Sequence, residues 1–186
     1  MTAAPPRTIA ITGATGFIGR HLCDHFRRLG WEVRGLVRNT AACPFGEKGV
    51  RLFACDLPEE LDRAGLEGAS VLVHCAYMTR FTDLAEAHRV NDLGTRRIIE
   101  EGRAAGVGRF VFLSSQSAHE EAESYYGRSK LALEKLFSPE RDAIFRSGLV
   151  LGKSGDGLFH RMCDRIRHAR VIPLFGGGHQ PIQTIH

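Results

Sequence analysis

The stretch Thr12-Gly13-Ala14-Thr15-Gly16-Phe17-Ile18-Gly19 decides the fold of this chain. It follows a short apolar run, Ile9 to Ile11, and opens an amphipathic segment, which is the strand, glycine turn and helix context of a dinucleotide-binding site. The first glycine allows the tight turn, the second leaves room for a pyrophosphate, and the third lets the helix pack closely on the strand. The helix N-terminus then offers free N–H groups and a partial positive charge to the phosphates.

Outward from this turn, short apolar runs alternate with segments of helical periodicity. Strands that alternate with helices form βαβ units, so the sequence predicts an α/β fold, a doubly wound parallel Rossmann sheet with helices on both faces. Ligands of such sheets bind at the carboxyl ends of the strands, near the switch in strand order. We expect strands at 7–12, 32–38, 50–54, 71–73, 110–113 and 143–151, and helices at 17–29, 84–105 and 125–137.

Length and composition narrow the class of protein. The 186 residues fit one domain, or one domain plus a fragment. No apolar run approaches the roughly 18 residues of a membrane span. The N-terminus lacks the apolar core of a signal peptide, and the five cysteines form no C-x-x-C pair, so we expect a cytoplasmic protein with reduced thiols.

The histidine pair His21 and His25 has no third ligand nearby in the sequence, so no metal is expected. A net charge of +4 favours anionic ligands, but no basic block is dense enough for nucleic acid.

Tyr126 and Lys130 lie four residues apart, so on a helix they share one face. Because an ammonium beside a phenol stabilises the phenolate, Tyr126 is a candidate general acid/base for a substrate hydroxyl or carbonyl. Tyr125 cannot replace Tyr126 in this role, because it does not have the four-residue spacing to Lys130. A serine at the end of the preceding strand, in the pair Ser114-Ser115, can hydrogen-bond the same oxygen. Alone, the Y-x-x-x-K spacing also fits an exposed aromatic–lysine pair.

Taken together, these motifs resemble the short-chain dehydrogenase/reductase superfamily, and within it the extended and atypical members of the NAD-dependent epimerase/dehydratase family. The resemblance implies an NAD(P)-dependent oxidoreductase or epimerase/dehydratase. Such an enzyme moves a hydride to or from a carbinol or ketone carbon of a small molecule, with nucleotide sugars among the candidates. The matching pieces run in order along nearly the whole chain: the turn 12–19, Asp56-Leu57, His74-Cys75-Ala76, Asn91, Gly94-Thr95, Phe110 to Ser115, Tyr126 to Lys130, and Arg146 to Gly152.

The resemblance also implies roles for single residues. Tyr126 would be the acid/base, Ser115 would polarise the substrate with Ser117 as the fallback, and Lys130 would hold the ribose hydroxyls and support Tyr126. For Asn91 and Asp56, plain structural roles in helix packing and in a turn remain alternatives. The implied cofactor-binding residues are Gly13, Thr15, Gly16, Phe17, Ile18, Asp56, Leu57, Cys75, Ala76, Tyr77 and Lys130.

The chain departs from the family pattern in two places. Only ten residues separate Ser115 from Tyr126, and that acidic loop suits surface exposure rather than a nucleotide phosphate. Residues 176–186 resemble the lead-in to a longer substrate domain. We therefore expect a NAD(P)-binding domain at 1–152 and, at 153–186, the start of a truncated substrate-binding region. A second hypothesis is a nucleotide-binding module without turnover, either a sensor or an inactive product of truncation.

The end of the second strand bears on the choice of cofactor. In NAD-selective sites an acidic side chain there accepts a hydrogen bond from the ribose 2′-hydroxyl. Here that position is Val37, and Arg38 follows it. Because arginine binds a phosphate through a charge-assisted fork, we expect NADP as the cofactor, with NAD as the second choice. The alternative is that Arg38 stacks on the adenine ring, which would serve NAD equally well.

The expected partners are a dinucleotide, a small-molecule substrate and a second copy of the chain, with no nucleic acid and no membrane. As in dimers of the family, the helices 84–105 and 125–137 could each offer a face to a twofold partner. Apolar side chains near the C-terminus would also seek burial in an assembly. These residues are Leu158, Phe159, Ile172, Leu174 and Phe175.

Overall fold

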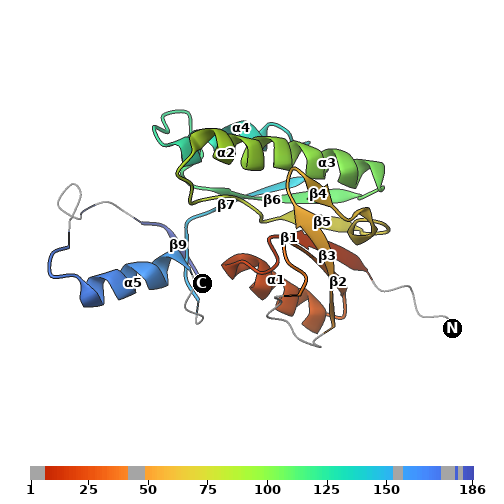
Figure 1. Ribbon diagram of the computed structural model, residues 1–186, viewed down its shortest axis with the longest axis horizontal. Helices are drawn as coiled ribbons and strands as arrows, with labels where there is room; N and C mark the ends of the chain where they lie inside the picture. Colours follow the sequence, from red (N-terminus) through yellow and green to blue (C-terminus); the bar gives the residue numbers. More distant parts are fainter. Residues whose placement is uncertain (1–6, 42–48, 153–156, 173–178, 180–181) are drawn as a thin grey trace.

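In the computed structural model, which describes residues 7–41, 49–152, 157–172, 179 and 182–186, seven strands form one sheet in the order β4-β3-β2-β1-β5-β6-β7 (Figure 1). Neighbouring strands pair in parallel, except that β4 runs antiparallel to β3. The predicted doubly wound α/β sheet is therefore confirmed. The strands are β1 (Thr8–Thr12), β2 (Glu32–Val37), β3 (Val50–Asp56), β4 (Glu60–Leu61), β5 (Val71–His74), β6 (Arg109–Ser115) and β7 (Ala143–Ser147).

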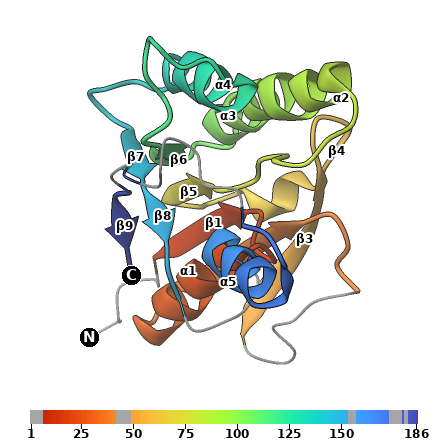
Figure 2. The same cartoon turned by 90° about the vertical axis from the view of Figure 1, so that its left-hand side faces the viewer.

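Helices cover both faces of the sheet. Figures 1 and 2 show α2, α3 and α4 on one face and α1 on the other. No helix among the described residues is long and apolar enough to cross a membrane. The helices are α1 (Phe17–Arg28), α2 (Leu84–His88), α3 (Gly94–Ala104), α4 (Tyr125–Glu134) and α5 (Leu158–His168).

The core has one apolar layer on each face of the sheet, because alternate residues of a strand point to opposite faces. Ile9 and Ile11 of β1 belong to the layer under α1, together with Cys23 of that helix. Ala10, between them, belongs to the opposite layer, where Phe110 and other residues of the sheet pack with residues of α3 and α4. The short, almost purely apolar strands thus reflect a sheet that is buried on both sides.

Two predicted elements are more complex in the structure. The expected helix 84–105 is one helical stretch made of α2, a π-helical turn at Arg89–Leu93 and α3. The expected strand 143–151 is divided into β7 and β8 (Leu149–Val150), and β8 pairs with β9 (Thr184–Ile185) instead of the large sheet. The division falls at Gly148, where an added Cβ would lie 2.1 Å from the carbonyl oxygen of Gln183.

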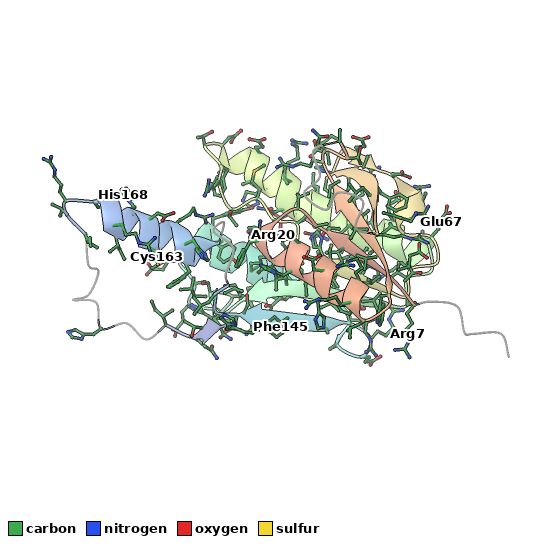
Figure 3. All side chains as sticks on the ribbon, turned by 90° about the horizontal axis from the view of Figure 1, so that it is seen from below. Arg7, Arg20, Glu67, Phe145, Cys163 and His168 are labelled. Atoms are coloured by element: carbon green, nitrogen blue, oxygen red, sulfur yellow. The ribbon has the colours of Figure 1, made fainter. Side chains whose placement is uncertain are left out.

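Helix α5 was not anticipated from the sequence. Figure 3 shows it extending away from the sheet, with Cys163 partway along it and His168 at its far end. Leu158 and Ile166 on this helix are more than half exposed, and Phe159 and Met162 are partly exposed. Helix α5 therefore contributes little to the core that positions the site.

The order of the strands places the site. From β1 the chain builds outward through β2 and β3, and then crosses back to β5 on the other side of β1. The carboxyl ends of β1 and β5 thus meet at the switch in strand order, where loops diverge to opposite faces and leave a crevice.

Candidate active site

A pocket of about 520 Å³ lies at this switch point. Its lining includes nine residues predicted to bind the cofactor: Gly13, Thr15, Gly16, Arg38, Asp56, Leu57, Cys75, Ala76 and Tyr77. Sequence reasoning missed Glu59 and the wall formed by Met78, Thr79 and Arg80, which lie in irregular chain without a motif. The ring of Phe17 packs instead against the rings of His21 and of His160 on α5, and Ile18 is half-buried in α1.

The glycine turn is shaped to receive an anionic group. Gly13 has a φ of +63°, and the N–H of Gly16 donates to the carbonyl of Gly13 at 2.9 Å, which closes the turn. Gly16 is also the N-cap of α1 and brings no side chain to the helix N-terminus. The first N–H groups of α1 are therefore open to an anion, which the positive end of the helix dipole favours.

A buried hydrogen-bond network fixes the turn against β5. The hydroxyl of Thr12 accepts from the N–H groups of Cys75 and Ala76, both at 3.1 Å, and lies 2.8 Å from Nδ1 of His74. Because both lone pairs of this oxygen are occupied, its proton is donated to Nδ1. The imidazole is then protonated on Nε2, which donates to the hydroxyl of Thr95 on α3 at 3.0 Å.

His74 is neutral within this network because it is buried. Burial, with a smaller effect from Lys130, lowers the pKa of His74 to about 3, and its ring stacks on Phe112. The imidazole is therefore a fixed link between β1, β5 and α3 rather than a proton carrier at neutral pH. The motif His74-Cys75-Ala76 was identified in the sequence, but the sequence did not predict that Thr12 and Thr95 are the hydrogen-bond partners of His74.

Asn91 holds the wall of the pocket in place. This side chain is 2 % exposed and lies in the π-helical turn. Its Oδ1 accepts from the N–H of Met78 at 2.7 Å, and its Nδ2 donates to the carbonyl of Met78 at 3.1 Å and to the hydroxyl of Tyr125 at 3.3 Å. Asn91 therefore positions the chain that follows Tyr77, beyond the packing role left open for it above.

Tyr77 connects the pocket to the predicted acid/base pair. Its ring meets the ring of Tyr126 edge-on at 5.4 Å, and Nζ of Lys130 lies 4.1 Å from the centre of the Tyr77 ring. Ser115, at the end of β6, is 9 % exposed, and its hydroxyl accepts from the N–H of Ser117 at 3.1 Å. The structure thus brings both Tyr126 and Lys130 into contact with Tyr77, while Ser117 is exposed on the following turn.

Lys130 is buried and points toward the sheet. Lys130 is only 4 % exposed. Its Nζ donates to the carbonyl of Leu113 at 2.7 Å and lies 4.5 Å from the centre of the Phe112 ring. Burial lowers the pKa of this ammonium to about 7, against the opposing influence of Cys75 and Glu134. Lys130 can therefore gain or lose a proton near neutral pH.

No group of three or more His, Cys, Asp or Glu side chains suited to a metal lies within the described ranges.

Comparison with known sequences gives matches along the chain. The sequence profile of the NAD dependent epimerase/dehydratase family matches residues 9–186. The ceramide reductase of Caulobacter vibrioides is 43% identical over 129 residues, which cover 68% of this chain and 40% of the reductase. The decarboxylating sterol-4-alpha-carboxylate 3-dehydrogenase of Mus musculus is 31% identical over 193 residues, which cover 90% of this chain and 52% of that enzyme. The chain thus spans about half or less of the length of these relatives.

A solved structure shares the arrangement of the sheet and helices. MoeE5, crystallised in complex with UDP-glucose and NAD, superposes with a TM-score of 0.79 and 28% sequence identity. The superposition covers 96% of this chain and 67% of MoeE5.

Proposed function

The chain belongs to the NAD dependent epimerase/dehydratase family, and on that premise we propose that it is an NAD(P)-dependent oxidoreductase or epimerase acting on a carbinol or ketone carbon. The observation that carries the proposal is the pocket at the switch point, with Tyr126 and Lys130 packed against its lining residue Tyr77. The open N-terminus of α1 at Gly16 suits the pyrophosphate of a dinucleotide. Gly13 lets the turn pack against the chain after β5, because a Cβ there would lie 2.9 Å from the backbone nitrogen of Ala76.

Each part of the chain has a distinct task in this proposal. When bound, the dinucleotide supplies the hydride chemistry, and the protein supplies binding, orientation and proton transfer. Tyr126 gives a proton to the substrate oxygen or takes one from it, Lys130 supports the phenolate, and Ser115 hydrogen-bonds the same oxygen. Ser114 does not compete for this role, because its hydroxyl donates to the carboxylate of Glu134.

Binding and turnover together test the function. We expect calorimetry to detect dinucleotide binding, and absorbance at the reduced nicotinamide band to report turnover with a ketone or alcohol. The names of the relatives guide the panel, which contains long-chain ketones, a sterol and UDP-glucose. Binding without turnover on the whole panel would favour the nucleotide-binding module, and absence of binding would reject both functions.

The pocket also supports a preference for NADP. Arg38 is exposed directly after β2 and lines the pocket, so its guanidinium is available to a 2′-phosphate. We expect NADP to bind more tightly than NAD by about 1.5–3 kcal/mol, and Arg38→Ala to remove most of this difference while leaving NAD affinity nearly unchanged. Arg51→Ala, at an exposed arginine of the neighbouring strand β3, is the control and should preserve the preference. Equal dissociation constants for the two cofactors in the parent protein, measured by calorimetry, would contradict the assignment.

We further infer that the chain forms a homodimer through the helices on the face of the sheet that α2, α3 and α4 cover. Leu84 of α2 is 50 % exposed and Leu93 of the π-helical turn is 54 % exposed, which leaves apolar surface for a twofold contact. Of the C-terminal apolar residues, Leu158, Phe159 and Ile172 are exposed, whereas Leu174 and Phe175 lie outside the described residues. Light scattering should give twice the mass of the chain, and a strict monomer at the highest soluble concentration would refute the dimer.

A further inference from the structure

A second buried charge lies on the same helix as Lys130. Glu134 follows Lys130 by four residues in α4, so the two side chains share one face of that helix. Glu134 is 8 % exposed and Lys130 is 4 % exposed, which is unusual for either residue type. A charged side chain is found buried where its partners compensate for the lost hydration. The partners of Glu134 and of Lys130 therefore indicate the role of each residue.

The carboxylate of Glu134 is tied to the ends of two strands. Nε and Nη2 of Arg146, on β7, donate to its two oxygens at 2.9 and 2.6 Å, and the hydroxyl of Ser114, on β6, donates to it as well. Burial alone would raise the pKa of Glu134, but the hydrogen bonds from Arg146 and Ser114 and the charges of Arg146 and Lys130 hold it below its usual value. Glu134 is therefore a fixed anion at neutral pH.

The ammonium of Lys130 has mostly neutral neighbours. Its hydrogen-bond acceptor is the carbonyl of Leu113, and the rings of Tyr77 and Phe112 lie beside it. From the end of β5, Cys75 and His74 also face it. Cys75 is a neutral thiol, because burial raises its pKa to about 12, and His74 is a neutral imidazole. On α4, Tyr126 lies one turn before Lys130 and Glu134 one turn after it. Because Cys75 is neutral, the charge of Glu134 is the one that favours the protonated form of Lys130.

We propose that Glu134 is a positioning residue that favours the charged form of Lys130 in its buried place beside Tyr126, with Arg146 and Ser114 fixing the carboxylate. A carboxylate one helical turn away stabilises an ammonium, and the low dielectric of the interior strengthens that attraction. The double hydrogen bond from Arg146 stops the carboxylate from swinging to solvent. The role given to Lys130 in turnover rests on the proposed function, whereas the coupling between the two charges does not.

The coupling is measurable without turnover. The chain has four lysines, Lys48, Lys130, Lys135 and Lys153, so 13Cε-lysine NMR gives four signals, and Lys130→Met assigns one of them. In Glu134→Gln, which keeps the shape of the side chain and removes its charge, we expect Lys130 to lose its proton at a pH lower by about one unit, a tenfold change in its dissociation constant. Glu140→Gln, at an exposed glutamate after α4, is the control and should leave the titration unchanged.

A purely structural role for Glu134 predicts a different result. If Glu134 only ties α4 to the strands, Glu134→Gln would lower the unfolding temperature while the Lys130 signal titrates as in the parent protein, and the proposal would be wrong. If Glu134→Gln does not fold, Glu134→Asp decides: a smaller downward shift supports the coupling, and an unchanged titration overturns it. A protein that binds no dinucleotide would reject the proposed function and leave this titration result standing.

Discussion

The Tyr126→Phe variant is expected to lose turnover by about 10²–10⁴-fold while keeping its affinity for the dinucleotide. The substitution removes one oxygen, the atom proposed to exchange a proton with the substrate, and keeps the ring that packs edge-on against Tyr77 at 5.4 Å. Because the packing beside the pocket is preserved, binding and chemistry should separate. Steady-state kinetics on the responsive member of the substrate panel, together with calorimetry for the dinucleotide, measures the two effects.

The neighbouring tyrosine provides a matched control. The ring of Tyr125 meets Phe81 and His88, and its hydroxyl accepts from Asn91, so Tyr125→Phe removes a hydroxyl on another face of α4. We expect that variant to keep most of its turnover. Lys130→Met should weaken both turnover and dinucleotide binding, and its effect should not add to that of Tyr126→Phe, because the two act as a unit. Full activity in Tyr126→Phe would refute the acid/base role.

The Gly19→Ala variant is expected to lose about 3 kcal/mol of folding free energy and, with it, dinucleotide binding. An added Cβ at Gly19 would lie 2.2 Å from the carbonyl oxygen of Gly13 and 2.9 Å from Cα of Ala14, both backbone atoms of the glycine turn. The turn cannot retreat, because a hydrogen bond closes it and Gly13 already lies against Ala76. Urea unfolding followed by fluorescence of Trp31, the only tryptophan, measures the loss.

The sign of this effect separates packing from helix propensity. Alanine in a helix interior is favoured over glycine by about 1 kcal/mol, so propensity alone predicts that Gly19→Ala stabilises the protein. Gly108→Ala is the control, because its Cβ would make only an ordinary contact, 3.4 Å from the carbonyl oxygen of Ser70. We expect that variant to unfold within about 1 kcal/mol of the parent. A Gly19→Ala protein as stable as the parent would mean that α1 does not need this close approach.

The parts of the protein that follow from neighbouring residues were determined by the sequence alone. The period of the apolar residues gave the alternation of strands and helices, the glycine turn gave the crossing into α1, and the spacing of Tyr126 and Lys130 put them on one helix face. Each of these inferences depends on the geometry of a few consecutive residues, which is the same in every helix or strand.

Only the tertiary structure decided what these side chains meet. The neighbours of Lys130 come from β6, from the chain after β5 and from α4, and the arginine that fixes Glu134 comes from β7. His74 likewise needs Thr12 and Thr95, which lie 62 residues before it and 21 after it. Sequence periodicity shows which face of an element is buried, but contacts between distant segments depend on how the strands are ordered and how closely the layers pack. The burial and charge of Lys130, and with them its coupling to Glu134, therefore arise only when four separate segments come together.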